Sequence, residues 1–234
     1  MPALQPVLDL DAARALDSLD AFAAPAITLK LMPGDLALVE ARNAAVVAWF
    51  ADLCCGLVPL SEGAVRFLGR DWQAMPPDYA AALRGRVGRV FADGAWVGFL
   101  DMATNILLPS LHHSREARDE LRAQATTLAC AFGLPGLPLE PPRDLAPIDL
   151  ARAACVRAFL GEPALLLLER PLQDQFEQLV TPLLDALASA RQRGAAAIWL
   201  TRGDLVWNDH SVPANHRMRL RERGLISLPT RLPA

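Results

Sequence analysis

The feature that most constrains the fold is an unbroken run of leucines, Leu165 to Leu168, which follows the turn-forming segment Gly161-Glu162-Pro163. A short apolar run with turn signals at its boundary predicts a β-strand that is buried on both faces. A helix is predicted before the run, at residues 149–160, and another after it, at residues 176–193, followed by a strand at residues 196–200. Because strands and helices alternate, we expect an α/β fold with a largely parallel sheet.

The rest of the chain supports the same class of fold. Further strands are predicted at residues 26–32, 36–39, 64–68, 86–91, 217–220 and 225–228, and further helices at residues 44–56, 78–84 and 114–132. The loop at residues 92–100 is rich in glycine and aromatic residues. A length of 234 residues fits one domain, or one domain with a smaller lobe.

Composition limits the chemistry. The chain has 23 basic residues but one lysine, Lys30, so a mechanism that needs lysine depends on where Lys30 lies. A net charge of −3 with scattered arginines gives no reason to expect a nucleic-acid partner. The apolar stretch at residues 44–60 contains Asp52 and ends near Pro59, which favours a buried helix over a membrane span. The start of the chain lacks the pattern of a secretory signal, and the cysteine spacing suggests reduced thiols, so we expect a cytoplasmic protein.

The order of several short segments resembles that of nucleotide-binding subunits of ABC transporters. The similarity covers about residues 33–228, and its landmarks are Pro33-Gly34-Asp35, Gly56-Leu57-Val58-Pro59, Glu62-Gly63, Gly88-Arg89-Val90-Phe91, Asn105 to Pro109, Arg152 to Leu160 with Glu162-Pro163, and residues 214–226. The resemblance implies an ABC-ATPase-like fold of the P-loop NTPase type. Its parts would be a mostly parallel sheet, an antiparallel β part and a helical lobe at about residues 93–160, within a single domain at residues 1–234.

The position of the family's phosphate-binding loop holds none of the expected residues. That loop, GxxGxGK[ST], is matched here by Ala41, Arg42, Asn43, Ala44, Ala45, Val46, Val47 and Ala48. Val47 stands at the lysine position, and Ala48 replaces the hydroxyl that holds Mg²⁺ in the family. Two interpretations remain open: Asn43 caps the helix that follows, or Arg42 and the helix N-terminus form a weak anion site.

The family's other functional positions are also changed. The resemblance places Ala92 at the Q-loop glutamine, Glu169 at the Mg²⁺-organising Asp, Arg170 at the catalytic Glu, Phe176 at the D-loop Asp, and Thr201-Arg202 at the switch His. The signature motif LSGGQ is matched by Leu145, Ala146, Pro147, Ile148 and Asp149. An arginine cannot deprotonate an attacking water, so no catalytic residue is predicted.

We therefore expect a pseudo-ATPase with no cofactor, acting as a structural or regulatory part of a transport system. Its partner would be a membrane permease, a second cassette subunit or both, which places it at the inner membrane and allows a dimer. Residues 93–97 and 105–109 look most like ATPase subunits of Mla/Mce-type lipid transporters. Trp96, Phe99 and Leu100 would then dock the permease, or else pack inside the lobe.

Two other functions remain open. One is a divergent ATPase that binds ATP and Mg²⁺ through Arg42, Glu169 and Arg170, and the other is a free-standing scaffold without a transporter. No metal site is predicted, because the adjacent His112 and His113 point apart and are expected in a solvated loop before a helix.

Overall fold

The computed structural model describes residues 4–16, 25–113, 116–172, 177–202, 204–209, 212–221 and 223–227. The strands are β1 (Leu8–Ala15), β2 (Ile27–Leu31), β3 (Leu36–Glu40), β4 (Leu60–Phe67), β5 (Arg70–Asp71), β6 (Val87–Val90), β7 (Leu165–Glu169), β8 (Ala196–Thr201), β9 (His216–Arg221) and β10 (Gly224–Ser227). The helices are α1 (Ala44–Cys54), α2 (Pro77–Arg84), α3 (Met102–His113), α4 (Arg118–Ala131), α5 (Pro147–Phe159), α6 (Glu177–Gln192) and α7 (Asp204–Asn208), with a 3₁₀ turn, η1, at Pro142–Asp144.

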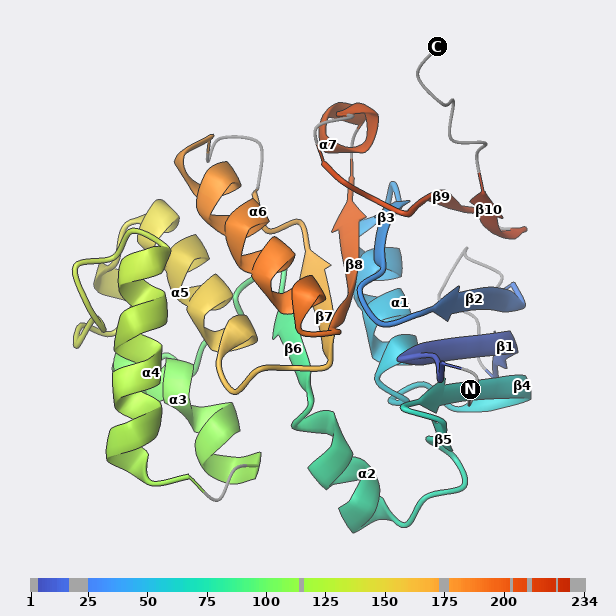
Figure 1. The fold of residues 1–234 in the computed structure, drawn as a ribbon, viewed down its shortest axis with the longest axis horizontal. Coiled ribbons are helices and arrows are strands. Elements are labelled where there is room, and N and C mark those ends of the chain that lie inside the picture. The colour runs from blue at the N-terminus through green and yellow to red at the C-terminus, as the bar shows by residue number, and fades with distance from the viewer. Residues whose placement is uncertain are drawn as a thin grey trace.

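The strands form two sheets. The larger has the order β10-β9-β3-β8-β7-β6 and is parallel except for the β9–β10 hairpin. The smaller is antiparallel, with the order β2-β1-β4-β5. Figure 1 shows helices α3 to α6 on one side of the larger sheet and α1 on the other, next to the smaller sheet. The predicted fold class, including its antiparallel part and helical lobe, is confirmed.

The leucine run forms β7, and its side chains divide between two hydrophobic cores. Leu165 and Leu167 belong to the core that includes α1 and the antiparallel sheet, whereas Leu166 and Leu168 belong to the core beneath α3, α4, α5 and α6. All four side chains are fully buried. Because successive side chains in a strand point to opposite faces, one run of leucines serves both layers.

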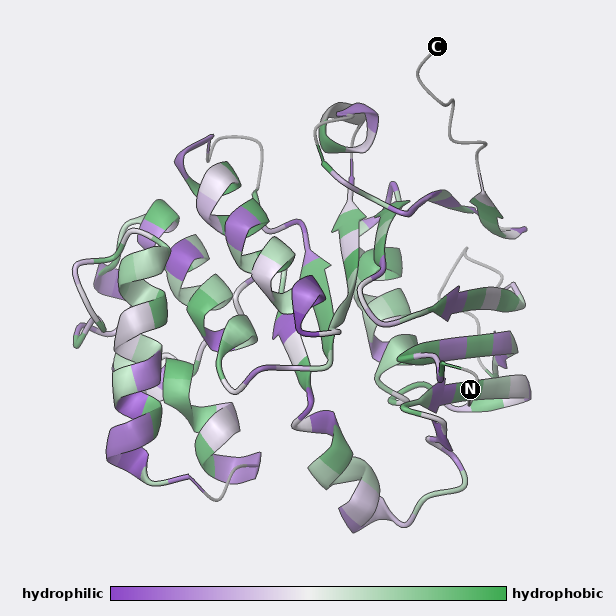
Figure 2. Cartoon of the chain, viewed as in Figure 1, coloured by the Kyte–Doolittle hydropathy of each residue, from purple (hydrophilic) through white to green (hydrophobic). Residues whose placement is uncertain are grey.

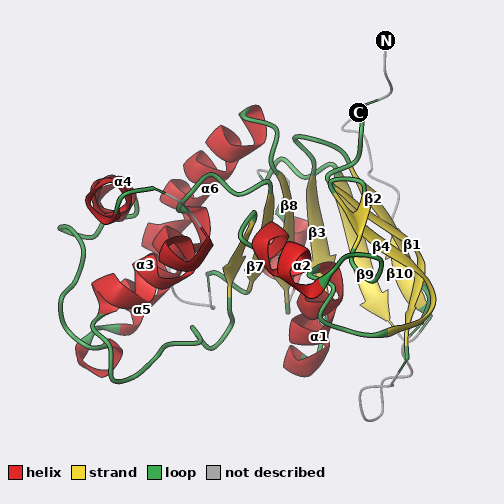
Figure 3. Cartoon of the chain, turned by 90° about the horizontal axis from the view of Figure 1, so that it is seen from below, coloured by secondary structure: helices red, strands yellow, loops and turns green. Residues whose placement is uncertain are grey.

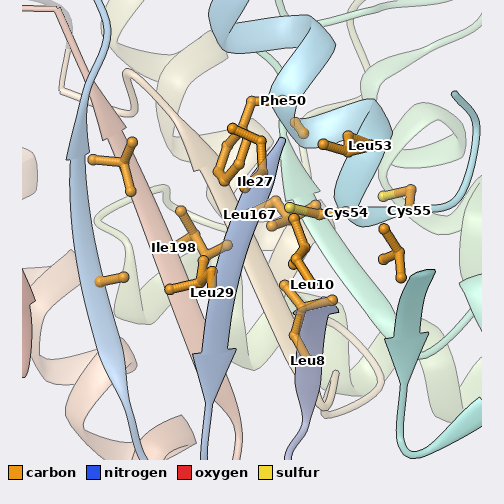
Figure 4. Close-up of a cluster of buried hydrophobic side chains, with 14 of the residues drawn as sticks. Leu8, Leu10, Ile27, Leu29, Phe50, Leu53, Cys54, Cys55, Leu167 and Ile198 are labelled. Carbon is orange, nitrogen blue, oxygen red and sulfur yellow. The ribbon is translucent and has the colours of Figure 1, made fainter. Parts of the chain in front are cut away.

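Helix α1 lies between the two sheets, and this position explains why it is apolar on nearly every side. Figure 4 shows Phe50, Leu53 and Cys54 between Leu10 and Ile27 of the antiparallel sheet and Leu167 and Ile198 of the parallel sheet. Figure 3 gives the same arrangement from below. Figure 2 shows hydrophobic residues along β7 and β8 and a hydrophilic start to the outer helix α4, whose first turn carries Asp119 and Glu120.

Besides the two-residue strand β5 and the short turn η1, three elements were not predicted from the sequence: β1, α3 and α7. His112 and His113 lie in the last turn of α3 rather than in a loop, so the predicted loop is wrong. Pro109 lies inside this helix, where a proline normally interrupts the pattern and hides the element. Within the described residues, no helix is both long and apolar enough to cross a membrane.

Candidate functional site: a cleft at the carboxyl ends of the parallel strands

The candidate site lies where strands β3, β7 and β8 end. Because the three strands are parallel, their last residues, Glu40, Glu169 and Thr201, lie at the same edge of the sheet. The connection after β3 is fixed to β8, since the Ala41 N–H donates to the Thr201 carbonyl at 2.9 Å. The structure thus places residues 41–48, Glu169, Arg170 and Arg202 at one edge, as the resemblance implies for a phosphate loop and its neighbours.

Helix α1 begins as an ordinary capped helix. Asn43 has an extended backbone, and its side-chain oxygen accepts the Ala45 N–H at 2.8 Å, which confirms the predicted N-cap. Val46 is 5% exposed and Val47 is fully buried, and both belong to the core between the sheets. Val47, which the resemblance places at the family's lysine position, is therefore a core side chain.

Arg89 connects its own strand, β6, to strand β7 and to helix α1. Its Nε donates to Glu169 Oε1 at 2.5 Å, and its Nη1 donates to Asp52 Oδ1 on α1 at 2.5 Å. Its Nη2 lies 3.4 Å from the Ala48 carbonyl oxygen. The guanidinium also lies over the ring of Phe91, 4.4 Å from the ring centre.

The Arg89 cluster was not predicted from the sequence. A usable signal was present, because Arg89 falls inside a predicted core strand, and a buried arginine needs a carboxylate partner. The partners could not be chosen from the sequence, since Asp52 and Glu169 are 37 and 80 residues away.

Burial and ion pairing shift the pKa values of Arg89 and Glu169 in opposite directions. Burial raises the pKa of the Glu169 carboxyl, while the Arg89 guanidinium and a hydrogen bond from the Ala92 backbone oppose that shift. Burial alone would lower the pKa of Arg89, but its bonds to Asp52 and Glu169 outweigh burial, and the pKa is raised. Arg89 therefore stays charged in the folded protein.

A second carboxylate at the same edge is also paired with arginine. Glu40 is buried at the end of β3, and its side chain contacts Arg221 and lies 3.7 Å from Arg219. Next to this pair is an open cavity of about 390 Å³, lined by Arg42, Asn43, Val46, Leu220, Arg221, Arg223 and Ile226. Arg42, the predicted remnant of an anion site, thus lies beside two arginines from β9 and the turn that follows.

Three regions that the sequence singled out meet at another cavity, of about 180 Å³. Its lining includes Trp96 from the loop after β6, Pro147 from the former signature segment, and Arg170. Residues 145–149 form the end of η1 and the first turn of α5, with Ala146 as N-cap and Pro147 in the first turn. Arg170 has φ +48°, a left-handed conformation that is strained for a side chain of this size.

The three predicted docking residues differ in exposure. Trp96 is half-buried beneath Arg157, whose guanidinium lies 4.1 Å from its ring centre and donates to the Gly94 and Ala95 carbonyl groups. Burial lowers the pKa of Arg157 to about 10. Leu100 is also half-buried, whereas Phe99 is 88% exposed. Trp96 thus packs within the lobe, and Phe99 faces outward.

Some predicted positions add little to the site. Arg202 is exposed just after β8, and Phe176 lies outside the described residues. In the part of the chain that the structure describes, no group of three or more His, Cys, Asp or Glu side chains could hold a metal ion.

Comparison with known proteins agrees with this arrangement. A dimeric structure of MJ0796, a bacterial ABC transporter cassette, matches with a TM-score of 0.78 at 17% identity, covering 93% of this chain and 96% of that one. The fold is therefore that of an ABC cassette.

Two curated relatives come from transport systems. Lipoprotein-releasing system ATP-binding protein LolD 1 of Rhodopirellula baltica is 26% identical over 162 residues, 68% of this chain and 70% of the relative. Cytochrome c biogenesis ATP-binding export protein CcmA 2 of Cupriavidus metallidurans is 31% identical over 176 residues, 74% of this chain and 79% of the relative. No family model matches the chain. The chain belongs to the family of ABC transporter ATP-binding proteins.

The family implies a magnesium–nucleotide complex, and the residues present do not fit one. Glu169, which the resemblance places at the metal position, is already paired with the Arg89 guanidinium. Val47, which the resemblance places where a lysine would contact phosphate, is a core residue. Asn43 already accepts a hydrogen bond from the Ala45 N–H at the start of α1, one of the groups that a phosphate would use.

Proposed function

We propose that this chain is a non-hydrolysing subunit of an ABC transport system, with a structural or regulatory role. The observation that carries the proposal is the start of α1, where Asn43 caps the helix and Val46 and Val47 lie in the core. A phosphate loop needs backbone N–H groups directed at the ligand and a lysine that reaches the phosphates. Here the same segment contributes core packing instead.

The changed residues across the cleft support this function. An active ABC ATPase needs a group that orients the attacking water, and the resemblance places Arg170, rather than a carboxylate, directly after β7. Pro147 in the former signature segment has no N–H to donate. An ATP site in this family needs a phosphate loop from one subunit and a signature motif from the other. Because the resemblance finds both motifs changed here, we infer that the chain neither hydrolyses ATP nor completes an ATP site on a partner subunit.

Nucleotide affinity tests the proposal directly. We expect isothermal titration of the purified protein with Mg-ATP to give no heat at micromolar concentrations, and steady-state assays to give no phosphate release. An ABC cassette with intact motifs, prepared in the same way, is the positive control. A dissociation constant in the low micromolar range for this chain would overturn the proposal.

A divergent ATPase is the second candidate, and one observation favours it. The 390 Å³ cavity beside α1 is lined by Arg42, Arg221 and Arg223 and is large enough for a small anionic ligand. A free-standing scaffold is the third candidate. The titration separates the second candidate from the first, and the presence of a permease gene beside this one separates the third.

For the transport role, we propose that the loop after β6 docks a membrane permease of the lipid-transport type, with the chain in the cytoplasm at the inner membrane. Asn105 on α3 fixes this loop. Its side chain accepts the Val97 N–H at 2.8 Å and donates to the Val97, Leu100 and Asp101 carbonyl groups at 3.0–3.3 Å. A buried amide thus holds in place the loop that exposes Phe99, and exposed aromatic residues are common at binding hot spots.

Co-purification tests the docking role. Phe99→Ala should reduce recovery of a co-expressed permease at least tenfold, with the fold unchanged by circular dichroism. Tyr79→Ala on α2 is the matched control, since Tyr79 is also an exposed aromatic residue, at 68%. Equal recovery with both variants would remove Phe99 from the interface.

A further inference from the structure

The surroundings of Arg89 contain oxygen atoms of the types that bind hard metal ions, although too few carboxylates for a complete site. Asp52 Oδ1 and Glu169 Oε1 lie 2.5 Å from its nitrogens, and the Ala48 carbonyl oxygen lies at 3.4 Å. Two carboxylates and a carbonyl are the ligand types that hard divalent cations prefer. The three oxygens come from α1 and from the end of β7, and they surround one guanidinium.

The guanidinium fills this space and is enclosed. The Arg89 side chain is 11% exposed and the Glu169 side chain 3%, while the ring of Phe91 covers the guanidinium 4.4 Å away. An arginine is always charged and binds carboxylates with directed N–H groups. Since it is part of the chain, it cannot dissociate or be diluted away as a bound ion can.

We propose that Arg89 is the permanent cation among the oxygens of Asp52, Glu169 and Ala48, and that it excludes divalent metal ions from them. This inference rests on the proposed function, because it gives the reason why the cleft would not hold a metal–nucleotide complex. In this proposal Arg89 determines ligand specificity, because its guanidinium fills the space that a divalent ion would need. Removing the guanidinium should leave two carboxylates that can bind a divalent ion.

Manganese without nucleotide is the probe, and electron paramagnetic resonance of free Mn²⁺ measures binding. Wild-type protein should bind no Mn²⁺ at this cleft up to millimolar concentrations. Arg89→Ala should bind one Mn²⁺ per chain at least tenfold more tightly than wild type, and Arg89→Ala combined with Glu169→Gln should lose that gain. Arg66→Ala is the control, because Arg66 also pairs with two carboxylates, Asp9 and Asp11, but at the surface.

Two results would overturn the inference. One is binding of Mn²⁺ by the wild type that is lost in Asp52→Asn, a comparison that needs no Arg89 variant. The other is a folded Arg89→Ala protein that binds Mn²⁺ no better than wild type. If Arg89→Ala does not fold, Arg89→Gln takes its place, since its amide can still donate to Glu169. Because no nucleotide is present, the result is independent of the Mg-ATP titration: ATP binding by the wild type would overturn the proposed function without deciding this one.

Discussion

Gly88 lies against the backbone of Ala158 so closely that a methyl group on Gly88 would be 1.9 Å from the Ala158 carbonyl oxygen. The contact joins β6 to α5, two elements that flank the candidate site. It also fixes the neighbouring Arg89 and Phe91 relative to Arg157 on the same helix, whose guanidinium lies 5.5 Å from the Phe91 ring centre.

We expect Gly88→Ala to lower the free energy of unfolding by about 1–3 kcal/mol, because backbone on both sides must shift to admit the methyl group. Urea denaturation followed by circular dichroism measures the effect. Gly98→Ala is the matched control, since no atom lies within 4 Å of its added carbon. Equal stability of both variants would show that β6 and α5 separate easily.

Arg89→Met should cost about 3–5 kcal/mol of stability, because it leaves the buried Glu169 carboxylate without its partner. The double variant Arg89→Met with Glu169→Met should recover most of that loss, since two apolar side chains can fill the same space. Asp52 remains solvated, as its side chain is 40% exposed. Chemical denaturation of the two single variants and the double variant measures the coupling. A double variant that loses the sum of the two single costs would contradict the buried pairing.

Asn43→Ala should destabilise the protein by about 1 kcal/mol, through loss of the cap on the Ala45 N–H. Asn43→Ser should retain most of the stability, because a serine hydroxyl can accept the same bond. Thermal melts at equal protein concentration compare the three proteins. If Asn43→Ala were neutral and lowered anion binding instead, the alternative role of this segment would gain support.

The thiols should differ sharply in reactivity. Cys130 is exposed, whereas Cys54, Cys55 and Cys155 are buried. Burial raises the pKa of Cys55 to about 11 and that of Cys155 to about 12, so neither forms a thiolate near neutral pH. Ellman's reagent at pH 8 should modify one thiol per folded chain, none after Cys130→Ser, and all the cysteines in guanidinium chloride.

The same shifts predict a loss of stability at alkaline pH. A buried thiol stays protonated in the folded state, while in the unfolded state it ionises near its ordinary pKa of about 8.5. The stabilisation is therefore complete below that value and declines as pH rises toward 11. Denaturation midpoints at pH 7 and pH 10 should differ in this direction, and less so in a Cys55→Ala variant.

Local sequence patterns predicted most of the fold because the parallel strands are almost entirely apolar and the helices between them have regular periodicity. Strand β1 escaped prediction, since its sequence, with charged residues and alanines, has little preference for a strand. It is a strand because it pairs with β2 on one side and β4 on the other. Such pairing is a property of the tertiary structure, which no local pattern records.

The candidate site was predicted only in part, for a related reason. The positions of Asn43, Glu169 and Arg170 follow from the order of segments along the chain. The contacts that decide their chemistry come from elsewhere: Arg89 reaches Glu169 from another strand, and Arg157 holds Trp96 from a helix about sixty residues later. A charged residue in a predicted core strand indicates that a partner of opposite charge is needed, but only the tertiary structure determines which residue that is.

The leucine run of β7 does not by itself determine how this strand aligns with its neighbours, and the buried pair of Arg89 and Glu169 supplies that information. Four identical side chains carry little information about alignment, because sliding β7 by two residues along β6 and β8 would still place leucine at two of the four paired positions. Glu169 breaks this degeneracy, because only one alignment brings its carboxylate to Arg89, and a slip of one residue would turn it toward the other core. The ion pair therefore sets the register of β7. Its removal should lower stability and should also favour folding intermediates in which β7 is out of register.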